Sequence, residues 1–455
     1  MSKIDTFRRA GISVVLAPGD AGYADAMAGF DLGVEVAPSV VIDAQTATDV
    51  ASAVSVAAEQ GTRLTALGSG HGRLDPLTGG AAISLRALDT VEVDASAGTA
   101  RIGAGCTWSP VVASAAAHGL AAPCGSSPAV GVVGYLLGGG VGPLARSFGF
   151  SSDHVRSFEV VTAADGPITV SRDAHPDLFW AMRGGKVGFG VVTAVTVELL
   201  PYAEISGGGV YFGADAAPDV LGAYADWASG LPESTTTSIA LLRLPDSPAL
   251  PPALSGRHVA HVRFASLDAF DSAQAQLVPL RAAATPLLDT VGVLPYAQVG
   301  SIHADPTAPM PVANGTASLT TLDHATVDAV LASGGLDVDL PLSAVEIRTL
   351  GGATLRESDL DAVGGRPTQQ LLNVYAAPVP SLPDEARLTA ARSVLDATAG
   401  HHLPNPLVNF VGRANASRAF ETSWRDDQKT RLDDVRRAHD PAGVFDTHPA
   451  RSRTG

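Results

Sequence analysis

Glycine is concentrated in one apolar segment of the chain, residues 119–155, which includes Gly138, Gly139, Gly140 and Gly142. Each glycine inside a helix costs roughly 1 kcal/mol relative to alanine, so this segment is not expected to form a stable helix. A backbone without side chains can instead approach a large planar or phosphate-bearing ligand closely. The alternative is a tightly turned loop buried in the core, and composition alone leaves both interpretations open.

A second glycine-rich stretch, "LTALGSGHGRLDPLTGG" at residues 64–80, follows a strand-like run and places His71 between Gly70 and Gly72. Its successive backbone N–H groups could hold a pyrophosphate. The stretch does not match the Rossmann fingerprint, because no G-x-G-x-x-G sequence opens a helix here. Taken alone, His71 could equally be a surface residue in a turn.

A third segment, "DLFWAMRGGKVGFGVVTAVTVELLP" at residues 177–201, carries further glycines ahead of a strand-like end. In this order and spacing, the three segments resemble the FAD-binding oxidoreductases of the vanillyl-alcohol oxidase superfamily, most closely the berberine-bridge-enzyme-like branch with 6-hydroxy-D-nicotine oxidase. The resemblance covers residues 35–201 and resumes in the C-terminal segment at "LVNF" and "RAHDPAGVFDTHP". It implies an α+β fold: a two-lobed PCMH-type FAD-binding domain and an α+β substrate domain whose antiparallel sheet is covered by helices.

The resemblance also implies FAD as the cofactor, bonded covalently at its 8α-methyl group to a loop histidine that matches His71. Many members add a bond from a cysteine, but Ser127 stands at that position, so a single covalent link is expected. Two further departures are Ala66 in place of the family's arginine, and "KVGFG" from Lys186 to Gly190 in place of "GGNFG". The residues expected to contact FAD are Gly68, Ser69, Gly70, His71, Gly72, Ser127, Val130, Gly131, Gly134, Gly138, Gly139, Gly140, Gly142, Gly190, Val191, Val192 and His448.

After residue 201 the glycine clusters thin out, prolines recur, and strand-like runs alternate with helical ones. This change in pattern suits a second domain built as an antiparallel sheet covered by helices. The expected division is a discontinuous FAD-binding domain at residues 1–201 and 405–455, and a substrate-binding domain at residues 202–404. If this layout holds, truncating the last forty or so residues should destroy flavin binding.

Oxidation of a C–OH or C–NH carbon requires a base that takes the proton while hydride passes to flavin N5. Glu346 and Arg348 are two residues apart in a strand-like run, so both should lie on the same face of a strand. They could line the cleft, or they could form a surface salt bridge. Tyr296 and Tyr375 are tyrosines expected to line the site. The candidate catalytic residues are Tyr296, Tyr375 and Glu346, with His448 as a further possible base; Arg348 and Tyr296 are the candidate substrate contacts.

Composition argues against several classes of partner. The chain has 455 residues and a formal net charge of −16, and no run of basic residues is longer than two arginines. Nucleic acid and anionic membranes are therefore not expected as partners. With only two cysteines, neither a disulfide framework nor a C-x-x-C metal site is expected. The first residues have no apolar run typical of a signal peptide, so we expect a soluble, cytoplasmic protein, monomeric or homodimeric, without a metal ion.

The function that the resemblance implies is a flavin-dependent oxidase. In this hypothesis, hydride leaves a carbon bearing OH or NH on a small organic substrate, with a secondary metabolite as the expected class, and oxygen reoxidises the flavin. Because the family's C-terminal tyrosine is missing here, a redox-neutral cyclase or eliminase on the same flavin scaffold stays open. A non-catalytic ligand-binding protein, of the kind that confers drug resistance, is the third possibility.

Overall fold

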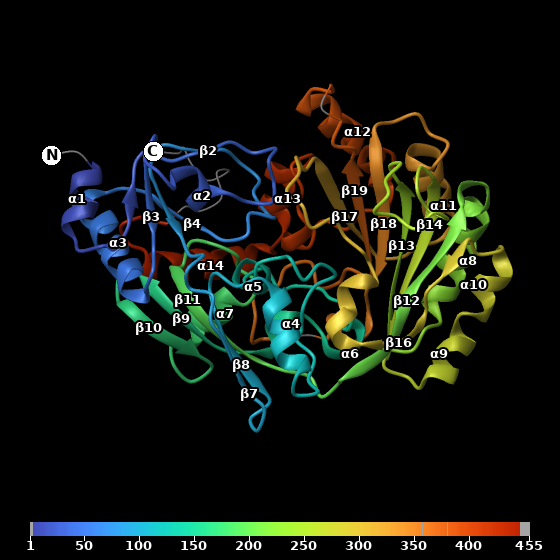
Figure 1. Cartoon of the computed structure of the whole chain (residues 1–455), viewed down its shortest axis with the longest axis horizontal. Helices are drawn as coiled ribbons and strands as arrows, with labels where there is room; N and C mark the ends of the chain where they lie inside the picture. The colour runs from blue at the N-terminus through green and yellow to red at the C-terminus, as the bar shows by residue number, and fades with distance from the viewer. Residues whose placement is uncertain (1–2, 357, 380, 446–455) are drawn as a thin grey trace.

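The computed structural model describes residues 3–356, 358–379 and 381–445. Its helices and strands form one lobe built on two smaller sheets and a second lobe built on one eight-stranded sheet (Figure 1). The predicted mixture of helices and strands is confirmed. Across the described ranges, none of the helices combines the length and the apolar character that a membrane crossing requires.

The first lobe begins with a four-stranded sheet in the order β1-β3-β6-β4. Its strands are β1 (Val15–Leu16), β3 (Val40–Asp43), β6 (Ala81–Ser84) and β4 (Leu64–Leu67). Helix α3 (Ala47–Gln60) connects β3 to β4, and both of these strands run parallel to β6. The helix starts at a capping box, in which the Thr46 hydroxyl and the Asp49 carboxylate each accept a hydrogen bond from the other residue's backbone N–H. Strand β4 leads directly into the loop that carries His71.

The second sheet of this lobe has five antiparallel strands in the order β10-β9-β11-β8-β7. They are β10 (Gly166–Ser171), β9 (Val155–Thr162), β11 (Val191–Glu198), β8 (Thr99–Gly103) and β7 (Val91–Asp94). The short strands β2 (Val36–Ala37) and β5 (Leu77–Thr78) pair separately. The lobe's other helices are α1 (Lys3–Arg9), α2 (Tyr23–Met27), α4 (Trp108–Ala116), α5 (Val132–Leu136), α6 (Ala145–Phe148) and α7 (Pro176–Met182). The glycine-rich segment therefore contributes only the short helices α5 and α6 and the 3-10 helix η1 (Ser151–His154), consistent with the low helix propensity of glycine.

The second lobe contains the eight-stranded sheet, whose main path is β15-β12-β14-β13-β18-β19-β17, with β16 pairing to β12. These strands are β12 (Glu204–Gly213), β13 (Thr235–Arg243), β14 (His258–Ser266), β15 (Leu288–Asp289), β16 (Gly292–Pro295), β17 (Asn314–Leu319), β18 (Leu342–Thr349) and β19 (Gln370–Ala376). All of its pairings are antiparallel, as predicted. Its helices are α8 (Ala217–Ser229), α9 (Phe270–Gln276), α10 (Val278–Ala283), α11 (His324–Gly334) and α12 (Asp384–Ala397).

The two faces of this sheet differ in chemistry because successive side chains on a strand point to opposite sides. On β14, Val262 and Phe264 join the core under the helices, together with Tyr224 of α8. The alternate residues His261 and Arg263 lie on the opposite face, which is turned toward the first lobe, with α8, α10 and α11 on the far side of the sheet (Figure 1). The second lobe thus presents a polar sheet face to the glycine-rich loops.

The C-terminal segment returns to the first lobe. Helix α13 (Ala416–Thr422) is followed by α14 (Asp426–His439), and Leu432 and Val435 of α14 pack in the core of the first lobe. The chain then reaches β4, where the backbone N–H of Leu64 donates to the carbonyl of Val444 at 2.8 Å. His448, predicted near the flavin, lies outside the described residues.

A buried arginine joins the two lobes. Arg146 of α6 donates hydrogen bonds to the carbonyl oxygens of Thr235 at 2.7 Å, Leu231 at 2.9 Å and Leu350 at 2.5 Å, all in the second lobe. Because each bond pairs a charged donor with a backbone acceptor away from water, this contact fixes the relative position of the glycine segment and the sheet.

Candidate active site

His71 lies in the loop after β4 and is held by two contacts. Its ring stacks on Phe30 with 4.1 Å between the ring centroids, and its Nδ1 lies 3.0 Å from Ser69 Oγ. Its Nε2 is buried and has no hydrogen-bond partner among the described residues. Burial lowers the pKa of His71 to about 4, so the ring is neutral near pH 7 and keeps an unshared electron pair. An oriented, uncharged imidazole with an unsatisfied nitrogen has the chemistry of a nucleophile.

Ser69 links the glycine-rich stretch at residues 64–80 to the glycine-rich segment at residues 119–155. Its Oγ accepts a hydrogen bond from the backbone N–H of Gly131 at 2.9 Å, while the same oxygen contacts His71. A Cβ at Gly131 would lie 2.9 Å from Ser69 Oγ, so a larger residue there would displace the serine. Two of the segments that the sequence singled out therefore meet at His71.

Three of the predicted cofactor-binding glycines border open space. A Cβ added at Gly68, Gly72 or Gly134 would have no protein atom within 4 Å, apart from immediate chain neighbours and, for Gly134, the backbone of its own helix. None of the three has a positive φ, so backbone conformation does not explain the choice of glycine. Bare backbone at Gly68 and Gly72, in the loop of His71, and at Gly134 in α5 fits a ligand that must approach the chain closely.

Other predicted glycines are required by the packing of the protein itself. A Cβ at Gly142 would lie 1.9 Å from the Cys124 carbonyl oxygen, and one at Gly138 would lie 1.9 Å from Asn409 Oδ1. Gly139, Gly140 and Gly190 have φ values of 98°, 82° and 150°, and Gly70 one of 77°. The buried-loop interpretation thus holds for part of the segment. Val191 and Val192 open β11 and are buried against β9, and FAD contact at all of these residues stays a prediction.

Ser127 occupies a turn together with Val130, whose backbone N–H donates to the Ser127 carbonyl at 3.2 Å. The Ser127 hydroxyl is buried and has no hydrogen-bond partner within the described part of the chain. Both cysteines are buried, and burial raises the pKa of Cys124 to about 12. Cys124 is therefore a protonated, packed side chain and not a reactive thiol.

Glu346 and Arg348 share the helix-free face of the sheet, as the sequence predicts. They do not form a surface pair: Glu346 is only 3% exposed. Its Oε2 accepts from Arg348 Nε at 2.8 Å and from Asn373 Nδ2 at 3.1 Å, and its Oε1 accepts from Arg263 Nη1 at 2.5 Å. Burial raises the pKa of Glu346, but the charges of Arg348 and Arg263 and the hydrogen bonds from Arg348 and Asn373 together lower it by more, so the pKa lies below its usual value. An ionised carboxylate with both oxygens engaged suits positioning Arg348 better than accepting a proton.

Arg348 reaches from the sheet to the first lobe. Its Nη2 donates to Ser126 Oγ at 3.3 Å, and Ser126 Oγ donates in turn to Asp305 Oδ2 at 2.8 Å. The guanidinium also lies over the ring of Phe410, 5.3 Å from its centroid. The loop that carries Ser127 is thereby tied to the predicted substrate-binding face.

The two candidate tyrosines have different surroundings. Tyr296 opens the short 3-10 helix η3 (Tyr296–Ser301) and is buried in the core of the first lobe, where its hydroxyl donates to the Ala122 carbonyl at 2.8 Å. This contact gives no support to a catalytic or substrate-binding role for Tyr296. Tyr375 is half-buried on the polar face of the sheet, and its hydroxyl has no hydrogen-bond partner among the residues described. Burial and the charge of Glu346 raise the pKa of Tyr375, so the phenol keeps its proton.

Two histidines beside this cluster, the buried His261 and the half-buried His303, were missed by sequence reasoning. His261 Nδ1 accepts from Arg263 Nε at 3.2 Å, and its ring stacks on Tyr211 at 3.8 Å between centroids. Neither His261 Nε2 nor His303 Nδ1 has a partner in the described ranges. Burial and nearby arginines lower both pKa values well below normal, so both rings are neutral. The alternation in "RHVAHVRFA" could have indicated His261 beside Arg263, but His303 follows η3 without any pattern.

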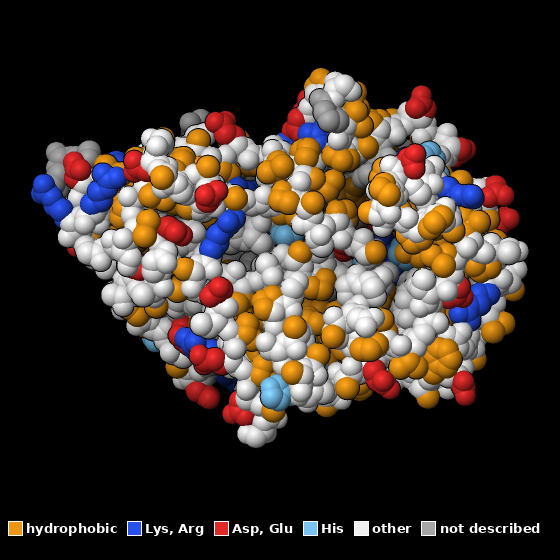
Figure 2. All heavy atoms as spheres, viewed as in Figure 1, with side chains coloured by type: hydrophobic (Ala, Val, Ile, Leu, Met, Phe, Trp, Pro, Cys, Tyr) orange, Lys and Arg blue, Asp and Glu red, His pale blue; other side chains and the backbone are white. Residues whose placement is uncertain are grey.

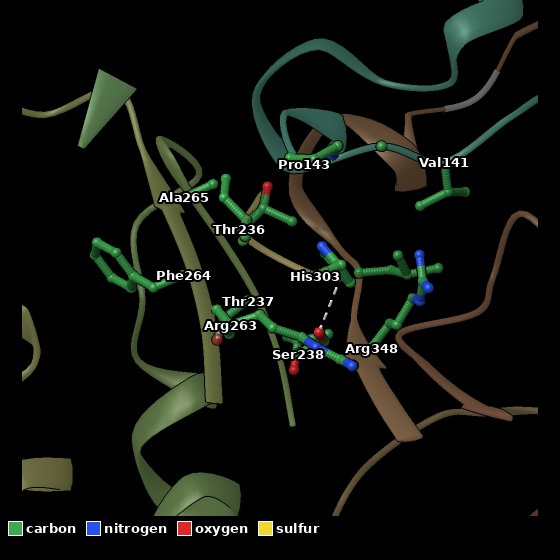
Figure 3. A pocket seen from close by; sticks show the side chains of 14 residues that line it. Val141, Pro143, Thr236, Thr237, Ser238, Arg263, Phe264, Ala265, His303 and Arg348 are labelled. Carbon is green, nitrogen blue, oxygen red and sulfur yellow. Dashed lines mark hydrogen bonds between the residues drawn. The ribbon is translucent and has the colours of Figure 1, made fainter. Parts of the chain in front are cut away.

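A small cavity marks where the polar sheet face meets the glycine segment. Figure 3 shows Val141 and Pro143 above it, with Ser238, His303 and Arg348 around it. His303 Nε2 lies 3.4 Å from Ser238 Oγ. The cavity volume of about 20 Å³ is enough for one water molecule. On the face drawn in Figure 2, acidic and basic side chains are interspersed around the periphery of both lobes.

Comparisons with known proteins identify the ligand of these loops. The FAD binding domain family matches residues 38–171, which include the His71 loop and the segment through α6. (R)-6-hydroxynicotine oxidase from Paenarthrobacter nicotinovorans is 38% identical over 198 residues, covering 42% of this chain and 43% of that protein. The match thus spans less than half the length of this curated relative.

Solved structures share the fold over nearly the whole chain. 6-hydroxy-D-nicotine oxidase from Arthrobacter nicotinovorans has a TM-score of 0.82 at 24% identity, covering 96% of this chain and 97% of that one. BBE-like 1 from Physcomitrella patens has a TM-score of 0.85 at 17% identity, covering 100% of both chains. Glucooligosaccharide oxidase from Acremonium strictum, described with a 6-S-cysteinyl, 8α-N1-histidyl FAD, has a TM-score of 0.81 at 20% identity over 98% of each chain. The predicted PCMH-type two-domain fold is confirmed.

The residues present fit this cofactor, because the orphaned nitrogen of His71 and the open glycine surfaces lie within the matched domain. The sequence match, the fold and the geometry of the loops therefore all indicate FAD as the ligand. Residues 38–171 of the chain form an FAD-binding domain, which is homologous to 6-hydroxynicotine oxidase, and the whole chain has the fold of PCMH-type FAD-linked oxidoreductases.

Proposed function

We propose that this protein is an FAD-dependent oxidase that takes hydride from a C–OH or C–NH carbon of a small organic molecule and passes the electrons to oxygen. The observation that carries the proposal is the half-buried, neutral His71 imidazole, whose buried Nε2 is unsatisfied beside the glycine loops. In this proposal His71 forms the single covalent bond to FAD, since Ser127 replaces the cysteine of doubly linked relatives. A covalently held flavin supplies the hydride acceptor for such a reaction.

The roles of the chain's own residues follow from their contacts. Ser69 holds the His71 ring through Nδ1, and the cradle is completed by the backbone at Gly68, Gly72 and Gly134. The domain made of residues 1–201 and 405–455 would hold FAD, and residues 202–404 would hold the substrate. The packing of α14 in the core of the first lobe supports this division.

On the substrate side, Glu346 fixes Arg348, and Tyr375 offers a protonated hydroxyl without a partner. Arg348 and Tyr375 would therefore bind and orient an oxygen or nitrogen atom of the substrate. Tyr375 donates a hydrogen bond in this arrangement, because its phenol stays protonated. The His303 imidazole beside a cavity that fits one water molecule stays neutral because its pKa is lowered, so it would form hydrogen bonds with water or substrate without carrying a charge.

One observation favours a second candidate, a redox-neutral cyclase or eliminase on the same scaffold. Of the predicted bases, Glu346 is fully engaged with arginines and Tyr296 is bonded to a backbone carbonyl. A reaction without net hydride transfer would not need a base that takes a proton while hydride leaves the same substrate carbon. Anaerobic addition of substrate separates the two candidates, because only the oxidase bleaches the flavin absorbance.

The first experiment is the intact mass of the denatured protein, compared with His71→Ala. Wild-type protein should be heavier by one FAD, and the variant should not. The holoenzyme is then screened anaerobically against secondary alcohols, phenols and cyclic amines, including both enantiomers of 6-hydroxynicotine, the substrate class in the name of the curated relative. Bleaching followed by peroxide formation in air supports the oxidase. Ligand that binds tightly and is recovered unchanged, with no bleaching, contradicts it.

A further inference from the structure

Lys186 is fixed at the end of helix α5 by its backbone. The N–H groups of Gly184 and Lys186 both donate to the carbonyl of Leu137, at 3.1 and 2.9 Å. Lys186 itself has a left-handed backbone, with φ at 68°. This conformation is uncommon for a residue with a long side chain, and it persists only where the surroundings enforce it.

The side chain of Lys186 returns to the same helix. Its Nζ donates to the Gly134 carbonyl at 3.0 Å and to Asn409 Oδ1 at 2.6 Å. Asn409 lies in η6 (Val408–Phe410) of the C-terminal segment, and its Nδ2 donates to the Tyr135 carbonyl at 2.7 Å. The ammonium group therefore lies where α5, the turn at residues 184–186 and the C-terminal segment converge.

No negative charge accompanies this ammonium. Both acceptors are neutral, and within the described residues no carboxylate forms an ion pair with Lys186. Lys186 is half-buried, and burial lowers its pKa to about 8, as expected where a cation is partly removed from water without a compensating charge. Such a group is costly unless an anion completes its surroundings.

The location indicates where that anion comes from. Gly134, whose carbonyl binds the ammonium, is one of the three glycines that border open space, and it belongs to the FAD-binding domain. FAD carries a negatively charged pyrophosphate, and its isoalloxazine can become anionic when reduced. We propose that Lys186 is the counter-ion for an anionic oxygen of bound FAD. This inference rests on the FAD binding of the proposed function. It adds Lys186 to the residues that would hold FAD, and Lys186 is a position at which the chain departs from the "GGNFG" pattern.

A rival interpretation is purely structural. Gly134 and Leu137 lie near the carboxyl end of α5, where a cation stabilises the unsatisfied carbonyl groups of a helix. In that case Lys186 would contribute to folding and not to cofactor binding. The two interpretations predict different measurements on the same variants.

The test uses the His71→Ala protein, in which FAD binds reversibly. Lys186→Met removes the charge, Lys186→Arg keeps it, and Lys186→Gln is the second neutral variant in case methionine folds poorly. Lys429→Met, which removes a lysine paired with exposed Asp426 on α14, is the matched control. The dissociation constant of FAD and the thermal midpoint of the flavin-free protein are measured for each.

If Lys186 is the counter-ion, both neutral variants should bind FAD about tenfold more weakly or worse, because a charge-assisted hydrogen bond is lost. Lys186→Arg should retain most of the affinity, and Lys429→Met all of it. Midpoint potentials then separate the two anionic groups. Equal weakening for oxidised and reduced FAD leaves the potential unchanged and assigns the pyrophosphate, whereas stronger weakening for reduced FAD lowers the potential and assigns the isoalloxazine.

Unchanged FAD affinity and potential in the neutral variants, with or without a lower thermal midpoint, would overturn the proposal in favour of the structural cap. This result leaves the covalent flavoprotein itself intact. Absence of FAD from wild-type protein and from protein incubated with FAD would instead refute the proposed function, so the two failures are distinguishable.

Discussion

The hydroxyl of Ser126, next to Ser127 in the first lobe, accepts a hydrogen bond from the guanidinium of Arg348 on the sheet of the second lobe at 3.3 Å. This contact joins residues that are 222 positions apart in the chain. It connects the loop that carries Ser127, a predicted FAD contact, to the buried network of Glu346 and Arg263. The candidate site therefore depends on both lobes, and a substitution at the contact in one lobe should alter the position of the side chains in the other.

His71→Ala should abolish the covalent attachment of FAD, because the nucleophilic ring nitrogen is removed. Ser69→Ala should slow the attachment without preventing it, since Ser69 Oγ orients His71 through Nδ1 and binds the Gly131 N–H. The intact mass of denatured protein, followed over time with added FAD, measures both effects. The exposed His118→Ala is the control and should become fully modified. Covalent FAD in His71→Ala would show that another residue carries the link.

Glu346→Gln should lower the free energy of unfolding by about 3–5 kcal/mol, because Arg263 and Arg348 lose the charge that compensates their burial. Urea unfolding checks this value. The control is Glu233→Gln, which breaks an exposed pair with Arg356 and should cost less than about 1 kcal/mol. Similar losses of stability in both variants would mean that the charge of Glu346 is not needed to compensate the buried charges of Arg263 and Arg348.

Acid should destabilise the protein through His261 and His303. Their pKa values are lowered in the folded state, so the unfolded chain binds protons first as the pH falls below the usual value near 6.5. Stability is therefore fully present above about pH 6.5 and declines below it, by at most ~1.4 kcal/mol per pH unit for each histidine.

His303→Gln should reduce this decline. Urea unfolding at pH 7.5 and pH 5.5 gives the difference for each protein, and the window lies above the range in which Glu346 becomes protonated. Exposed His118→Gln should leave the wild-type difference unchanged. An identical pH dependence in wild type and His303→Gln would contradict the assignment of His303 as a buried neutral imidazole.

Two kinds of glycine substitution should separate folding from cofactor binding. Gly142→Ala should strongly destabilise the fold, because its Cβ would lie 1.9 Å from the Cys124 carbonyl. Gly72→Val should leave the thermal midpoint of flavin-free protein nearly unchanged, because a Cβ there meets no protein atom within 4 Å, yet it should reduce FAD incorporation. Absorbance of flavin relative to protein, measured with thermal unfolding, distinguishes the two. Normal FAD loading in Gly72→Val would remove this glycine from the cradle.

Several features of the molecule were predictable because they depend on short-range patterns. The capping box at Thr46 and Asp49 begins α3, and the two-residue spacing of Glu346 and Arg348 places both on one face of β18. The glycine loop identified His71 as a candidate through its lack of neighbouring bulk and its resemblance to a known family. In each case the physical constraint acts between residues close in sequence, so it can be read without knowing the fold.

The surroundings of these residues were decided by tertiary structure. Arg263 and Glu346 are 83 positions apart, and Lys186 and Asn409 are 223 positions apart. Tyr296 was predicted at the substrate, but its hydroxyl is bonded to a carbonyl 174 positions away in the core. His303 has no sequence pattern, and only the fold of the second lobe brings it to Ser238, 65 positions away.

The sequence by itself located the FAD-binding domain, singled out His71 as the candidate for covalent attachment, and determined which side chains share a strand face, because backbone periodicity and glycine content act locally. Only the tertiary structure decided which charges are neutralised, which imidazoles stay uncharged and which hydroxyl groups remain free. These properties depend on burial and on partners brought together by the packing of one lobe against the other, and desolvation has no local signature in the chain.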